Sequence, residues 1–187
     1  LYAAYYWNRH AVDKDPGAHR VNINGYFGWE ALKTWDASRV RQNVERAREL
    51  KGRPLKLSAD NLEKILEEAV PRFEQVLLYF PPVHAELLEA QILDASSGNQ
   101  AAYLTWKRAI IRIAARHPNV VLLDYQRVND YTRKDENYWD YSHFRSNLRQ
   151  MILEDFASYL RTGRLSHPDF GHVANAAYGD RLTVSPS

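Results

Sequence analysis

The chain has 187 residues, 45% of them hydrophobic, which is enough for one domain with a sizeable core. Its 25 Lys and Arg residues nearly balance 23 Asp and Glu residues, and a net charge of +2 argues against nucleic acid as the main partner. The absence of cysteine excludes disulfides, thiolate nucleophiles and zinc–cysteine sites, and no apolar run reaches the roughly 18 residues that a membrane span needs.

The N-terminal region, residues 1–57, combines aromatic side chains with strongly charged stretches. Turn signals in its first half predict irregular structure, and a charged helix is expected from about Asp36 to Gly52. The aromatic side chains suit either a sugar-binding platform or, more commonly, packing against the core. Because the chain begins at Leu1 rather than Met, we expect it to be a fragment of a longer domain or a processed product.

Residues 58–162 are expected to form an α/β unit. A first helix has Ser58 as its N-cap and an apolar stripe at helical spacing. The short apolar run 75–80 fits a strand buried on both faces, as in a parallel sheet. An amphipathic helix over residues 99–117 and a second apolar run at 120–125 complete a strand–helix–strand unit. The sequence therefore predicts an α/β fold with a parallel sheet flanked by helices.

His84 stands just beyond the first expected strand, after two prolines that cannot continue a strand ladder. In open α/β sheets the loops beyond the carboxyl ends of strands hold the ligands, so His84 is a candidate substrate-binding residue. The alternative is that His84 caps the short helix expected over residues 84–95.

Asp140 and His143 form the one acid–imidazole pair at a short, chemically useful spacing. Residues three apart on a helical turn lie on the same face, so the Asp140 carboxylate is expected within 2.6–3.2 Å of His143 Nδ1. The ring can then take a proton from a nucleophile through Nε2. The alternative is structural: Asp140 or Ser142 caps the last helix, and His143 occupies its first turn. The remaining residues, 163–187, are interpreted as a turn-rich tail.

Three segments together resemble the C-terminal half of the SGNH/GDSL-like hydrolase and acyltransferase superfamily: residues 76–84, residues 120–125 and residues 138–144 with the Asp-x-x-His motif. The polysaccharide O-acetyltransferase branch, which includes the alginate acetylation proteins, is the most similar. This resemblance implies an SGNH-type α/β fold, with His143 as general base and Asp140 as its orienting carboxylate. It also implies an extracytoplasmic location such as the periplasm.

The serine nucleophile of that superfamily has no recognisable counterpart in this chain. Residues 1–75 contain only Ser38 and Ser58, and neither follows a glycine or a hydrophobic strand. No G-x-S-x-G elbow occurs anywhere in the sequence. Three explanations stay open: the serine belongs to sequence outside this chain, Ser97 serves in a rearranged site, or the domain has lost catalysis and now binds.

The leading functional hypothesis is therefore an esterase or O-acetyltransferase that acts on an acylated carbohydrate through an acyl-serine. Such a mechanism uses His143 and Asp140 and requires no metal or organic cofactor. The expected partner is a carbohydrate or acyl-ester substrate. The rival hypothesis is a non-catalytic carbohydrate-binding or scaffold domain that uses the aromatic N-terminal segment.

Overall fold

The computed structural model describes residues 35–49, 57–93 and 98–182. The chain divides into two units, Leu1–Trp35 and Asp36–Ser187, and the features below all belong to the second. The aromatic N-terminal segment and the end of the first charged helix at Gly52 lie outside the described residues. The single domain, the irregular N-terminal structure and the sugar-binding platform therefore stay predictions.

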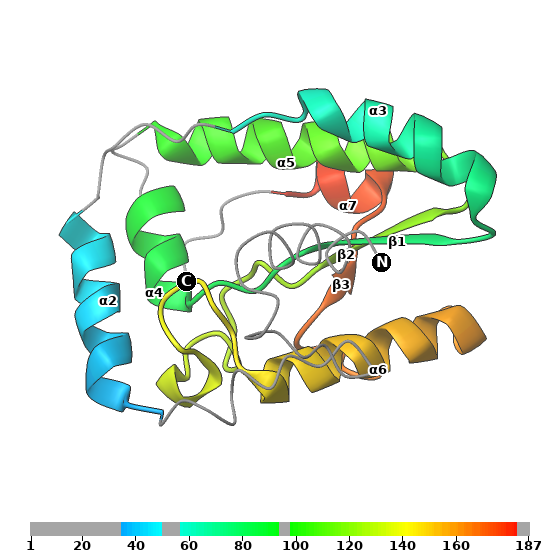
Figure 1. Ribbon diagram of the computed structural model, residues 1–187. Helices are drawn as coiled ribbons and strands as arrows, with labels where there is room; N and C mark the ends of the chain where they lie inside the picture. The colour runs from blue at the N-terminus through cyan, green and yellow to red at the C-terminus, as the bar shows by residue number, and fades with distance from the viewer. Residues whose placement is uncertain (1–34, 50–56, 94–97, 183–187) are drawn as a thin grey trace, which may run out of the picture. The chain divides into compact units, whose positions relative to one another are not determined.

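A small mixed sheet forms the centre of the second unit (Figure 1). Its strands are β1 (Val76–Phe80), β2 (Val120–Asp124) and β3 (His172–Val173), in the order β1-β2-β3. β1 and β2 are parallel, as the sequence predicts, with Val76 opposite Val120. β3 runs antiparallel to β2, so the expectation of a parallel sheet is wrong for this edge. β3 belongs to residues 163–187, for which the sequence predicts only a turn-rich tail.

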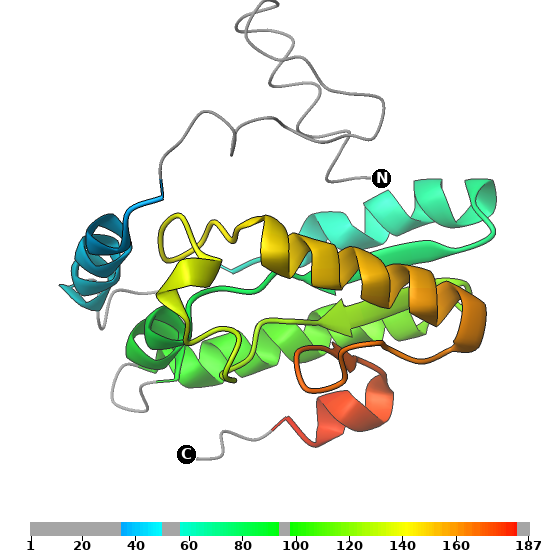
Figure 2. The same cartoon turned by 90° about the horizontal axis from the view of Figure 1, so that it is seen from below.

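Helices cover both faces of the sheet (Figures 1 and 2). One face carries α3 (Asp60–Ala69), α5 (Asn99–Ala115) and α7 (Ala176–Asp180), and the other carries α6 (Ser146–Thr162). Side chains alternate accordingly along β2. Leu122 packs in the same cluster as Ile111 of α5, whereas Leu123 packs with Ile152 of α6. The apolar runs that predicted strands buried on both faces are thus explained by a three-layer arrangement.

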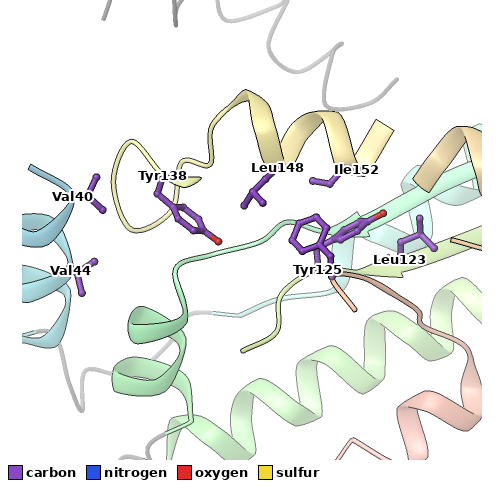
Figure 3. Packing of buried hydrophobic residues seen from close by; sticks show 8 residues of the cluster. Val40, Val44, Leu123, Tyr125, Tyr138, Leu148 and Ile152 are labelled. Carbon is purple, nitrogen blue, oxygen red and sulfur yellow. The ribbon is translucent and has the colours of Figure 1, made fainter. Parts of the chain in front are cut away.

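Four further helical elements, one long and three short, lie near the end of the sheet where β1 and β2 terminate. They are α2 (Ala37–Glu49), α4 (Ala85–Leu87), the π-helix η3 (Leu88–Ile92) and the 3₁₀ helix η5 (Asp135–Asn137). From α2, Val40 and Val44 point toward the buried ring of Tyr138, and all three belong to the core cluster on the α6 side of the sheet (Figure 3). The charged helix expected from Asp36 is therefore amphipathic, with two valines on its inner side.

Helix ends differ from the predictions by one to three residues. The N-cap of α3 is Ala59, although Ser58 Oγ still accepts a hydrogen bond from the Asp60 N–H at 3.1 Å. The helix expected over residues 99–117 ends at Ala115. The last helix begins at Ser146 and ends where Gly163 adopts a left-handed φ of 70°, a conformation that glycine tolerates best.

A close contact holds the C-terminal segment against the sheet. A Cβ atom on Gly171 would lie 2.4 Å from Cε1 of Tyr125, so only glycine allows this approach. Next to it, the ring of Phe170 is fully buried with its centroid 4.9 Å from that of Tyr125. The segment that looked turn-rich in sequence therefore supplies an edge strand and part of the core.

A buried ion pair lies at the carboxyl end of β2. Lys107 Nζ is 2.7 Å from an oxygen of Asp124, and their side chains are 3% and 0% exposed. The Lys107 ammonium also donates to the Tyr103 hydroxyl and to the Gln126 carbonyl, both at 3.1 Å. Asp124 in turn accepts hydrogen bonds from the Gln126 N–H and the Tyr178 hydroxyl. The pair thus ties α5, β2 and α7 together.

Replacing Lys107 by Met is expected to lower the free energy of unfolding by about 3 kcal/mol, because the Asp124 carboxylate is left buried without its cation. The double variant Lys107→Met with Asp124→Leu should lose less than the two single variants added together, since no charge is then stranded. Urea unfolding measures both effects. The exposed Arg112→Met on the same helix is the control, and its change should stay within about 0.5 kcal/mol. If the double variant lost as much free energy of unfolding as the two single variants added together, the pairing would be contradicted.

Candidate functional site

The Asp-x-x-His motif lies at the tip of a hairpin that precedes α6. Tyr138 and Phe144 form an antiparallel bridge. The Trp139 N–H donates to the carbonyl of His143, and the Arg145 N–H donates to the carbonyl of Asn137, each at 2.8 Å. These backbone bonds define the hairpin, residues 137–145, that presents Asp140 and His143.

The carboxylate of Asp140 organises the tip of this hairpin. Its Oδ2 lies 2.7 Å from His143 Nδ1, which confirms the distance expected from the sequence. Its Oδ1 accepts the backbone N–H groups of Ser142 at 2.8 Å and His143 at 2.9 Å. Asp140 therefore caps a turn of the hairpin, as aspartates often do. The alternative that Asp140 or Ser142 caps the last helix is wrong, because α6 starts at Ser146 with Arg145 as its N-cap.

The charge and tautomer of the pair follow from these contacts. Partial burial raises the pKa of Asp140, but hydrogen bonds from the His143 ring and from the Ser142 and His143 backbone outweigh it, and the net pKa lies well below the ordinary value. A carboxylate that stays ionised only accepts hydrogen bonds, so Nδ1 of His143 carries the proton. In the neutral ring Nε2 is then the basic atom. The His143 side chain is 66% exposed, so this atom belongs to a ring that solvent reaches.

Ser142 is the serine nearest to the pair in sequence, and its place argues against a nucleophilic role. Its Oγ lies 3.4 Å from Nδ1 of His143 and donates to Asp140 at 3.2 Å. A nucleophilic hydroxyl must instead approach Nε2, the nitrogen that accepts the proton. The other serine considered from the sequence, Ser97, lies outside the described residues. Ser38 bonds to Asp36 at the start of α2 and has a local structural role.

An aromatic–cation stack flanks the hairpin tip. The guanidinium carbon of Arg145 lies 5.1 Å from the ring centroid of Trp139, and Arg145 also donates to the Glu136 carbonyl at 2.7 Å. Sequence reasoning did not assign a role to this contact, because residues six apart face each other only once the hairpin bridge exists. The contact links the two strands of the hairpin on either side of its tip.

His84 lies in the interior, with its side chain 0% exposed. Its Nδ1 accepts the N–H of Glu86 at 3.3 Å, which makes His84 the N-cap of α4, and its Nε2 lies 3.0 Å from an oxygen of Asp135. The alternative role of helix capping is therefore confirmed. A substrate would reach His84 only if the surrounding residues moved, so its substrate-binding role stays a prediction. The His84 backbone N–H does contact the site, because it donates to the Tyr141 carbonyl at 2.9 Å.

No match to this chain is found among the models of protein families, the curated proteins or the solved structures. Within residues 35–49, 57–93 and 98–182, no three His, Asp or Glu side chains gather in a way that would hold a metal ion. Over the same ranges no helix combines the length and apolar character that crossing a membrane requires. The assignment of Asp140 and His143 as a candidate functional site thus depends on their geometry.

The burial of His84 predicts a pH-dependent stability. Burial lowers the pKa of His84 from its ordinary value of 6.5, although Asp135 and Glu86 oppose the shift. Below pH 6.5 the unfolded chain therefore takes up a proton that the folded chain does not, and stability falls until the lowered pKa is passed. The free energies of unfolding of the native chain and of His84→Gln should converge as the pH falls through this window. Parallel curves in urea titrations from pH 8 to pH 5 would contradict this account.

Proposed function

We propose that the Asp140–His143 pair supports ester chemistry on an acylated carbohydrate, by hydrolysis or by transfer of an acetyl group. The observation that carries this proposal is the 2.7 Å contact between His143 Nδ1 and Asp140 on an exposed ring. This contact is the one that a general base and its orienting carboxylate need, which are the roles that the SGNH/GDSL-like resemblance implies. The α/β fold with helices on both faces of the sheet is compatible with that superfamily.

In this mechanism Nε2 of His143 removes the proton from a serine hydroxyl while its oxygen attacks the ester carbonyl. The Asp140 carboxylate stabilises the imidazolium that forms and holds the ring in position. The imidazolium then returns the proton to the departing alcohol, leaving an acyl-serine. Water or a sugar hydroxyl next takes up the acyl group by the same proton transfers. The proposal places the serine outside the Asp140–His143 hairpin.

The rival is a non-catalytic carbohydrate-binding or scaffold domain, and one observation favours its scaffold form. Polar groups at the carboxyl ends of strands commonly form the ligand site of an α/β sheet. Here His84 beyond β1 and Asp124 at the end of β2 are both 0% exposed and bonded within the fold. The usual position for a ligand is thus occupied by the chain's own side chains. Under this rival, Asp140 and His143 only shape the hairpin.

Hydrolysis of p-nitrophenyl acetate separates the two functions. We expect the chain to hydrolyse this ester above the buffer rate and His143→Ala to lose at least about tenfold, since a positioned general base contributes that much or more. Asp140→Asn should lower the rate as well, because the amide no longer fixes the Nδ1 tautomer.

His167 provides a matched control for this assay. Its Nε2 lies 2.7 Å from Glu154, so it is a second surface imidazole with a carboxylate partner. His167→Ala should keep the native rate if the chemistry belongs to His143. Equal background rates for the native chain and His143→Ala would reject catalysis by this chain. Equal losses in both histidine variants would show only nonspecific imidazole catalysis.

A further inference from the structure

The hairpin that carries Asp140 and His143 is fixed to the rest of the unit both at its base, through Tyr138, and near its tip, through Tyr141. The fully buried ring of Tyr138 lies edge-on to the ring of His84, with centroids 5.2 Å apart. The His84 N–H bonds to the Tyr141 carbonyl at 2.9 Å, and the next amide, of Ala85, bonds to the Thr132 carbonyl at 2.8 Å. The position of the hairpin tip therefore depends on where His84 sits.

Both ring nitrogens of His84 have a partner, the Asp135 carboxylate at Nε2 and the backbone N–H of Glu86 at Nδ1. Because Nδ1 accepts the Glu86 N–H, the ring proton lies on Nε2 and is donated to Asp135. The charged groups that face the ring are Asp135 of η5, Glu86 of α4 and Arg41 of α2. A second ring proton at Nδ1 would point at the Glu86 N–H and remove the cap of α4. The neutral Nε2–H tautomer is thus the one that fits.

Helix α2 supplies the cations that fix these two carboxylates. The Arg41 guanidinium donates to both oxygens of Asp135 and to Glu86, and Arg48 donates to the second oxygen of Glu86. Asp135 and Glu86 are only 19% and 20% exposed, so these pairs are screened less than ordinary surface pairs. On its inner side α2 also places Val40 and Val44 in the cluster that contains Tyr138. A single helix therefore reaches His84 and the hairpin base by separate charged and apolar contacts.

We propose that His84 is a positioning residue that couples the docking of helix α2 to the geometry of the Asp140–His143 pair. With α2 docked, Arg41 holds Asp135, Asp135 holds the His84 ring, and His84 holds the hairpin through Tyr138 and Tyr141. With α2 released, the hairpin loses its fixed position and opens more often, so that both its backbone bonds and the Asp140–His143 contact are populated less. This inference rests on the proposed function only for its consequence, the effect of the coupling on catalysis. The coupling itself can be measured without an ester substrate.

Hydrogen exchange and imidazole nitrogen shifts of the full chain test the coupling. Arg41→Gln removes the central cation, whose side chain is 44% exposed, and leaves the core unchanged. We expect protection of the Trp139 and Arg145 amides to fall by about tenfold, a local opening effect. The ¹⁵N shifts of His143 should move from the Nδ1–H tautomer toward the Nε2–H tautomer. Arg46→Gln, an exposed arginine of the same helix, should change neither reading.

Two further measurements make the result decisive. The Ala174 amide, which bonds to Leu122 in the sheet at 2.8 Å, should keep its protection in Arg41→Gln. Arg48→Gln breaks only the link to Glu86, so its effect on the hairpin should have the same direction and a smaller size. Unchanged hairpin protection and tautomer in Arg41→Gln, or an equal loss at Ala174, would overturn the coupling. Failure of ester hydrolysis with these shifts intact would reject the proposed chemistry and leave the coupling in place.

Discussion

The burial of β1 and β2 on both faces is the constraint that shapes the rest of the unit. Apolar side chains alternate toward α5 and α6, so neither face can stay in water without a large loss of hydrophobic stabilisation. Polar groups at the strand ends are buried as a result, and each needs a hydrogen-bond or ion-pair partner in the interior. Asp124 finds Lys107 and Tyr178, and His84 finds Asp135 and the Glu86 amide.

This constraint explains why the exposed acid–imidazole pair lies on a hairpin instead of at the strand ends. The side chains of His84 and Asp124 are buried and bonded to other groups of the fold. Asp140 and His143 instead extend from a hairpin whose tip is accessible to solvent. The pair obtains its short-range order from the turn that Asp140 caps. It obtains its position in the molecule from distant groups, namely Tyr138 in the core and the His84 amide. Under the proposed function, chemistry and positioning are thus carried by different residues.

Much of the α/β unit could be predicted because its signals are local. The apolar runs at 75–80 and 120–125 have strand length and contain β1 and β2, and the helix between them has a regular apolar stripe. The Asp140–His143 contact was predictable for the same reason, since three residues of chain limit how far the two side chains can separate. The helix cap by His84 was predictable as an alternative from its place after Pro82.

Contacts between distant parts of the sequence were decided only by the tertiary structure. The two-residue strand β3 is too short to leave a pattern, and it exists because Gly171 lets the chain approach Tyr125. The links from Arg41 to Asp135 and from Lys107 to Asp124 span 94 and 17 residues, and charged residues at such separations have many potential partners. By itself the sequence determined the two buried strands, most of the helices and the Asp140–His143 pair, because these follow from local spacing and burial. Which groups surround that pair and hold it in place depends on packing, which brings together residues that no local pattern relates.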